Sequence, residues 1–212
     1  YTPYLTDASA TAQPFIIGNG RNRQASQEAA AAKAAHDVLV ALYPNRQAIF
    51  ASELADSLAG IHPIGAQVGT EIGRIAAQRL LAARANDGWN APATPYVLSN
   101  APGNWQPAPA AAGFTQFPAV VPFALTSNAQ FAPAAPPALT SDEYAASLNE
   151  VKEIGSATSA TRTADQTQIA RLWANVNTPT TVWYVWNNVA RSISASRGLT
   201  TAENARLFAL LN

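Results

Sequence analysis

The chain has 212 residues, of which 48% are hydrophobic and only 12% are charged, and its formal net charge is zero. This length is sufficient for a sizeable hydrophobic core. A neutral charge balance argues against electrostatic binding to nucleic acid or to an anionic membrane surface. The chain lacks cysteine, which excludes disulfides and thiolate chemistry, and no stretch reaches the roughly 18 uninterrupted apolar residues of a membrane span.

The first expected segment, residues 1–24, is irregular, because its stretches YTPYL and FIIGNG contain turn residues and have little periodicity. The chain starts with Tyr1 and contains no methionine. It is therefore expected to have been processed, cut or only partly recorded. No signal peptide is visible, and the removal of an earlier one would account for this. We favour a secreted or periplasmic location.

Residues 25–87 form the first expected helical group, in which strong helix formers predict three helices. Each helix is bounded by residues that are typical of helix ends. These boundary residues are Ser26 and Pro44 for the first helix, Asn45 and Gly60 for the second, and Pro63 and Gly88 for the third.

Three glycines in the third helix, Gly65, Gly69 and Gly73, are spaced four residues apart. Such spacing occurs where two helices pack closely, either in a membrane dimer or in a soluble protein. Glu71 and Arg74 lie inside the same run. Their charges favour close packing against another helix of a soluble protein.

Residues 88–139, which we call the strap, contain ten of the fifteen prolines, and no charged residue occurs from Gly88 to Ser141. Disordered segments are usually poor in aromatic residues, whereas the strap is rich in them. Aromatic rings bury large areas, so we expect an ordered strap that is packed across the helices by its rings. The rings belong to Trp89, Tyr96, Trp105, Phe114, Phe117, Phe123 and Phe131.

Residues 140–212 form the second expected helical group, which we expect to pack with residues 25–87 as one domain. Four helices are predicted, and no convincing pair of alternating strands is present, so the fold class is all-α. The helix starts have capping boxes or a Thr-Pro pair. These starts are Thr140 with Glu143, Thr163 with Gln166, Thr178 with Pro179, and Thr200 with Glu203.

The last predicted helix, within GLTTAENARLFALLN, has almost no polar face after Arg206. A helix that is apolar all round is normally buried on all sides, whereas a chain terminus normally lies at the surface. We therefore expect a contact surface for a partner on this helix. Its residues are Leu207, Phe208, Leu210 and Leu211.

Candidate catalytic and metal-binding residues are few. His36 and His62 have no completed ligand set at metal-binding spacing, so no metal site is expected. Glu150 and Glu153 share a helix, but Lys152 lies between them, which favours a solvated face over a carboxylate site. The aromatic residues Trp183, Tyr184 and Trp186 are interpreted as core, because basic partners for nucleic acid are missing.

The most distinctive polar cluster is SATRTADQT, which contains Arg162, Asp165 and Gln166 around a helix start. An acid in the first turn is favoured by the helix dipole, which accounts for Asp165 without any function. The apolar flanks and the evident pairing of Arg162 with Asp165 equally suggest a buried polar network. The sequence leaves both interpretations open.

Two stretches, RTADQT followed by Trp173 and ENARLFALLN at 203–212, resemble bacterial vanadium-dependent haloperoxidase-like proteins of the type-2 phosphatidic acid phosphatase superfamily. Upstream stretches resemble the same family in the same order. They are IGRIAAQRLLAARANDG, PGNWQPAP and VPFAL. The resemblance covers most of the chain from about Ala29 onward, and it implies a helical bundle that is an incomplete part of a larger helical enzyme.

The resemblance also implies a partner for the last helix. In such proteins this helix continues into a segment with a Lys and an Arg-Pro pair, a Ser-Gly-His turn and a later Arg with a second His, which together hold vanadate or phosphate. None of these is in this chain. The resemblance thus implies a helical scaffold portion without a cofactor of its own, with vanadate or phosphate bound by the intact haloperoxidase-like or acid-phosphatase-like enzyme.

Within this resemblance, Asp165 is expected to lie toward the catalytic portion and to orient an anion-binding Arg there, with Arg162 and Gln166 holding it. The partner of the last helix is then the C-terminal catalytic portion or, failing that, a second copy in a homodimer. The alternative is a stand-alone helical binding or structural domain without enzymatic activity. The reading frame beyond Asn212 distinguishes these possibilities.

Overall fold

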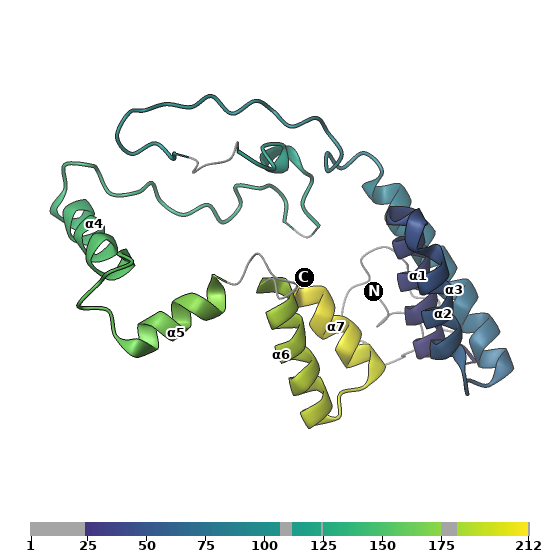
Figure 1. Ribbon diagram of the computed structural model, residues 1–212. Helices are drawn as coiled ribbons and strands as arrows, with labels where there is room; N and C mark the ends of the chain where they lie inside the picture. The colour runs from purple at the N-terminus through teal and green to yellow at the C-terminus, as the bar shows by residue number, and fades with distance from the viewer. Residues whose placement is uncertain (1–23, 107–111, 124, 175–181, 212) are drawn as a thin grey trace. The chain divides into compact units, whose positions relative to one another are not determined.

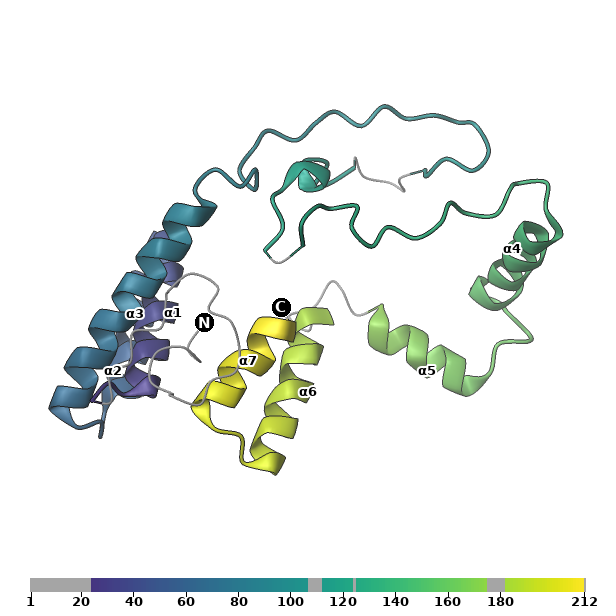
Figure 2. The same ribbon diagram turned by 180° about the vertical axis from the view of Figure 1, so that it is seen from behind.

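The computed structural model describes residues 24–106, 112–123, 125–174 and 182–211. These residues contain seven α-helices, two short 3-10 turns and no β-strand, which confirms the all-α class. The chain divides into two compact units, shown from two sides in Figures 1 and 2. Unit 1 comprises Tyr1–Ala85 and Asn175–Asn212, and unit 2 comprises Asn86–Ala174. The expected packing of residues 140–212 with residues 25–87 as one domain stays a prediction.

The first helical group of unit 1 has the three predicted helices. They are α1 (Gln27–Leu42), α2 (Gln47–Leu58) and α3 (Pro63–Arg84), and the turn η1 (Pro44–Arg46) joins α1 to α2. The Ser26 hydroxyl accepts a hydrogen bond from the backbone N–H of Ala29 at 3.1 Å, as its capping position predicts. Pro44 follows the end of α1 and begins η1. The three helices lie side by side (Figure 1).

Helices α1 and α3 pack through residues with small side chains. Gly69 and Gly73 of α3 are buried, and a Cβ built on Gly69 would lie 2.5 Å from the carbonyl oxygen of Ser26. The predicted close packing of these glycines against another helix is confirmed. The buried hydrophobic residues of the described part are all alanines: Ala29, Ala30, Ala76, Ala77 and Ala190. No large side chain in that part is fully buried.

The second part of unit 1 is a helical hairpin of α6 (Val182–Arg197) and α7 (Thr201–Leu211). Gly198, with φ of +60°, ends α6 in a left-handed conformation that favours glycine. The backbone N–H of Leu199 donates to the carbonyl of Ser194 at 3.1 Å, which closes the turn. The predicted start of α6 at Thr178 and Pro179 lies outside the described residues.

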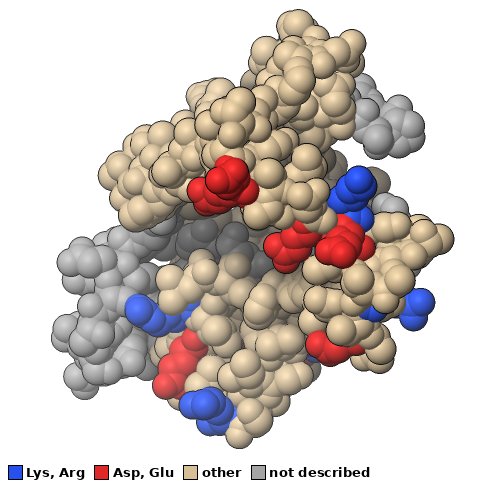
Figure 3. Space-filling view, turned by 90° about the vertical axis from the view of Figure 1, so that its left-hand side faces the viewer, with Lys and Arg blue, Asp and Glu red and all other residues tan. Residues whose placement is uncertain are grey.

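The described residues of the strap form turns, stretches without regular secondary structure, and one 3-10 turn, η2 (Phe117–Ala119). The prediction that its rings are buried against helices is wrong, because all seven remain at least 43% exposed. Several rings instead contact one another, as Tyr96 and Trp105 do with centroids 5.3 Å apart. Charged side chains are sparse on the face shown in Figure 3, where most of the surface is neither acidic nor basic.

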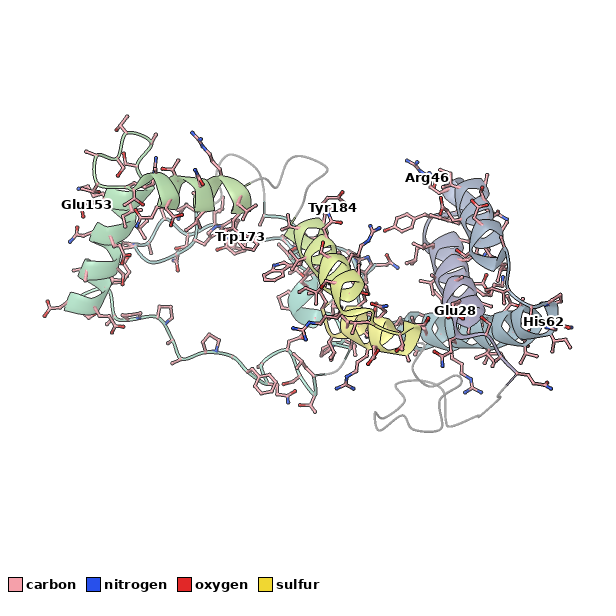
Figure 4. All side chains as sticks on the ribbon, turned by 90° about the horizontal axis from the view of Figure 1, so that it is seen from below. Glu28, Arg46, His62, Glu153, Trp173 and Tyr184 are labelled. Atoms are coloured by element: carbon pink, nitrogen blue, oxygen red, sulfur yellow. The ribbon has the colours of Figure 1, made fainter. Side chains whose placement is uncertain are left out.

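Unit 2 ends with α4 (Asp142–Gly155) and α5 (Ala164–Trp173). The predicted cap of α4 at Thr140 is wrong by one residue. Ser141 has the extended backbone of a capping residue, and its hydroxyl accepts from the backbone N–H of Tyr144 at 3.1 Å. Neither helix has a buried residue. Their side chains project outward along their length, with Glu153 on α4 and Trp173 at the end of α5 (Figure 4).

Candidate functional site

Arg162 holds together the turn between α4 and α5. Its Nη1 donates to the carbonyl oxygens of Ile154 and Ser156, both at 2.9 Å, and its Nε donates to the hydroxyl of Thr167 at 3.1 Å. The half-buried guanidinium therefore joins the end of α4 to the first turns of α5. These acceptors are backbone and hydroxyl oxygens, so the observed role of Arg162 is to hold the turn between α4 and α5.

Asp165 does not join this arrangement. Its side chain is exposed in the first turn of α5, and it forms no ion pair with Arg162. The buried network expected from the pairing of Arg162 with Asp165 is therefore not formed, because the guanidinium is occupied by carbonyl and hydroxyl acceptors. The position of Asp165 suits the helix dipole. Its expected action on a catalytic portion stays a prediction.

Gln166 belongs to the predicted capping box of α5. Its backbone N–H donates to the Thr163 hydroxyl at 3.1 Å, and its side-chain Oε1 accepts from the Thr163 backbone N–H at 2.9 Å. This reciprocal pair satisfies two backbone donors at the helix start. Gln166 is thus occupied locally, as Arg162 is, and Asp165 is the member of the cluster with an exposed functional group.

The apolar surface of α7 is incompletely covered. Leu207, Phe208 and Leu211 are half-buried, and Leu210 is 74% exposed. The predicted capping box is present: the Thr200 backbone N–H donates to Glu203 Oε2 at 2.8 Å, and the Glu203 N–H donates to the Thr200 hydroxyl at 3.3 Å. Helix α7 is therefore well defined at its start and presents apolar side chains toward its end.

Helix α6 also has an exposed apolar stripe. Trp186, Val189 and Ile193 share one face at helical spacing, and all three are exposed. The interpretation of Tyr184 and Trp186 as core is wrong, because both side chains remain exposed. Tyr184 is labelled on α6 in Figure 4. The side chain of Trp183 lies outside the described residues. Burial of these rings depends on tertiary contacts that the local sequence does not specify.

Helix α1 has a polar cluster that was not predicted from the sequence. Lys33 Nζ lies 2.6 Å from Asp37 Oδ1, and His36 Nδ1 lies 2.8 Å from the same oxygen. Partial burial raises the pKa of Asp37, but the hydrogen bonds of Lys33 and His36 outweigh it and lower the pKa overall. The spacing of Lys33 and Asp37, four residues apart on a helix, is the signal that predicts this pair.

A second polar contact joins parts of the chain that are far apart in sequence. The Thr201 hydroxyl at the start of α7 donates to Glu28 Oε1 in the first turn of α1 at 2.9 Å. The Ser26 hydroxyl donates to Glu28 Oε2 at 2.9 Å. Glu28 therefore lies where α1 and α7 approach (Figure 4). Hydrogen bonds from its own backbone N–H, from Thr201 and from Ser26 lower the pKa of Glu28.

This lowered pKa makes stability depend on pH. Because the folded state favours ionised Glu28, its contribution is present above the ordinary pKa of 4.5 and is lost as the pH falls through the lower folded pKa. We expect the thermal midpoint, followed by circular dichroism, to fall less steeply below pH 4.5 in Glu28→Gln than in the parent chain. Glu53→Gln, on the exposed surface of α2, is the control. Equal acid sensitivity of Glu28→Gln and the parent would contradict this role of Glu28.

The described part of the chain has neither a metal-binding cluster nor a membrane-spanning helix. No group of three His, Cys, Asp or Glu residues there can hold a metal ion. None of the helices described is long and apolar enough to cross a membrane.

Comparison of the chain with protein-family models, with curated proteins and with solved structures finds no match. The family resemblance therefore rests on the sequence motifs.

Proposed function

We propose that this chain is the helical scaffold portion of an enzyme similar to vanadium-dependent haloperoxidases and acid phosphatases. The catalytic portion, which binds vanadate or phosphate, packs on the apolar surface of α7. The resemblance of the RTADQT and ENARLFALLN stretches to that family is the observation that carries this proposal.

The positions of the two stretches support the proposal. RTADQT forms the turn into α5, where Arg162 and Gln166 fix the backbone and leave the Asp165 carboxylate exposed. The described residues of ENARLFALLN, 203–211, lie in α7, whose start is fixed by its capping box. A rigid support under an exposed carboxylate is what a positioning residue needs in order to act on a neighbouring portion.

The apolar residues of α7 supply a second support. Full burial of a leucine side chain contributes about 1.5–3 kcal/mol relative to exposure. Leu210 is largely exposed, so most of this contribution is still available at that residue, whereas Leu207 and Leu211 are already half-buried. A partner portion with an apolar surface would gain it on docking, and we assign this role to the catalytic portion.

In the described part of the chain, three of the basic side chains that could bind vanadate or phosphate are already engaged with other partners. An oxyanion needs several Lys, Arg and backbone N–H donors that converge on it. Lys33 is paired with Asp37, and Arg74 donates to Glu71 and to Gln78. Arg162 is occupied by carbonyl oxygens. In this proposal the chain contributes position and support, and the anion-binding side chains belong to the catalytic portion.

The reading frame beyond the codon for Asn212 tests the proposal. A Lys, an Arg-Pro pair, a Ser-Gly-His turn and a later Arg and His would support the enzyme. The protein of that whole frame would then be assayed for vanadate-dependent halide oxidation and for phosphatase activity. A stop codon directly after Asn212 would favour the stand-alone binding or structural domain instead.

In that whole protein, Asp165→Ala is expected to lower kcat/KM by about 10–100-fold, the usual effect of removing a residue that orients another functional group. The thermal midpoint should change little, because Asp165 is exposed and makes no side-chain hydrogen bond. Asp142→Ala, in the first turn of α4, is a matched control that removes another exposed first-turn acid. Equal activity of both variants would make Asp165 a helix-start acid only.

A further inference from the structure

Three aromatic rings of the strap form one exposed patch, which we call the aromatic patch. The Trp89 and Phe117 rings have centroids 5.1 Å apart, and the Phe117 and Phe114 rings have centroids 4.9 Å apart. All three side chains are exposed, Phe114 to 67%. Aromatic rings in mutual contact usually bury one another in a core, whereas here a continuous ring surface faces outward.

The patch is held in place by two hydrogen bonds to Asp87, the residue directly before the strap. The Val121 N–H donates to the carbonyl oxygen of Asp87 at 2.8 Å, and the Trp89 N–H donates to the Asp87 carboxylate at 2.9 Å. Phe114 has φ of +56°, which is unfavourable for a bulky residue. Strained backbone of this kind concentrates at binding sites. The strained backbone of Phe114 places its ring in the exposed patch.

The chemistry of the patch suits an uncharged ligand. No charged residue occurs from Gly88 to Ser141, so the patch itself supplies no ionic contact. Among the residues that the structure describes, the indole N–H of Trp89 has no acceptor, although its backbone N–H and carbonyl are both hydrogen-bonded. A ring surface with one available donor suits a ligand that has apolar rings and unpaired carbonyl oxygens.

The strap itself contains such a ligand at Pro133–Pro137, with the sequence PAAPP. This segment is exposed, has neither helix nor strand, and makes no backbone hydrogen bond. Prolines fix the backbone near the polyproline II conformation, whose carbonyl oxygens remain available as acceptors. Because this conformation is largely formed before binding, little entropy is lost on docking.

We propose that the aromatic patch of one copy binds the Pro133–Pro137 segment of a second copy. Proline-rich segments dock on exposed aromatic rings in this way in several classes of recognition domain. Proline rings stack on Phe117 and Phe114, and the Trp89 indole N–H donates to a carbonyl of the segment. Each copy has both a patch and a segment, so two reciprocal contacts form a closed dimer.

The test is the self-association of the full chain, measured by sedimentation velocity over a range of concentrations. Two variants each remove one side of the contact: Trp89→Ala removes the donor and a ring, and the triple variant P133A/P136A/P137A removes the proline rings. Each alone is expected to raise the dimer dissociation constant at least about tenfold. Tyr96→Ala, which removes an exposed ring outside the patch, is the control and should leave the constant unchanged.

Mixing the two defective variants gives the decisive result. Trp89→Ala still has an intact segment, and the proline variant still has an intact patch, so their mixture forms one of the two contacts. We expect a heterodimer in the mixture that neither variant forms alone. Self-association that survives in both variants, or that is absent from the mixture and the parent alike, would overturn the proposal.

This test is separate from that of the proposed function. Association through α7 would be reduced by Leu210→Ser. It would not change in Trp89→Ala or in the proline variant. Loss of the dimer in Leu210→Ser but not in the strap variants would also overturn the proposal for the strap. The reading frame beyond Asn212 has no bearing on either result.

Discussion

Gly69→Ala and Gly73→Ala are each expected to lower the free energy of unfolding by about 1–3 kcal/mol, the usual cost of overpacking. A Cβ on Gly69 would lie 2.5 Å from the Ser26 carbonyl oxygen and 2.9 Å from the Ala29 Cβ. A Cβ on Gly73 would lie 2.9 Å from the Ala34 backbone nitrogen. These neighbours belong to the backbone of α1 or are anchored to it, so relief requires the two helices to move apart.

The sign of the change in the free energy of unfolding distinguishes a closely packed glycine from an exposed one. In an exposed helix, replacing glycine by alanine stabilises by about 1 kcal/mol, because alanine has the higher helix propensity. Gly65→Ala is the matched control on the same helix, since its Cβ would lie 3.4 Å from the nearest atom, the Gln24 carbonyl oxygen. Urea unfolding of the three variants measures the difference. Stabilisation by Gly69→Ala and Gly73→Ala would show that α1 and α3 do not approach this closely in solution.

Arg162→Ala is expected to open the turn between α4 and α5. The variant loses three side-chain hydrogen bonds, and a bond to a charged group contributes about 1.5–3 kcal/mol. We expect the protection factors of backbone amides in the first turn of α5 to fall at least about tenfold in hydrogen-exchange mass spectrometry. A tenfold change corresponds to about 1.4 kcal/mol.

Two further variants define the cause. Arg162→Lys keeps the charge but lacks the planar guanidinium that reaches acceptors on both sides, so it should restore little of the protection. Arg171→Ala removes another arginine from an exposed position on α5 and should leave the protection unchanged. Full protection in Arg162→Ala, or loss of protection equal to that of Arg171→Ala, would contradict the role of Arg162 as the link between the helices.

Three of the predicted capping residues are confirmed, because the chemistry of a helix cap is local. Ser26, Thr163 and Thr200 each meet backbone groups within three residues, so the side chain and its partner are visible in one short stretch. The close approach at Gly69 and Gly73 is predicted for the same reason, since the four-residue spacing places both glycines on one face.

Features that depend on distant partners are predicted poorly. The contact between Glu28 and Thr201 joins residues at opposite ends of the chain, and no local pattern indicates it. Opposite charges close in sequence suggest a pair of Arg162 and Asp165 as one of two interpretations, whereas the observed partners of Arg162 include carbonyl oxygens, which every residue has. Composition also does not specify that the strap rings contact one another and remain exposed.

The small side chains between α1 and α3 have a consequence for folding kinetics. Alanine and glycine lose almost no side-chain rotamer entropy when they are ordered, whereas each long side chain loses up to about 2 kcal/mol. The contacts of Gly69 and Gly73 with α1 also span a much shorter stretch of chain than the contact between Glu28 and Thr201. Contacts between residues that are closer in sequence cost less entropy to close. We therefore expect α1 and α3 to associate earlier during folding than α1 and α7.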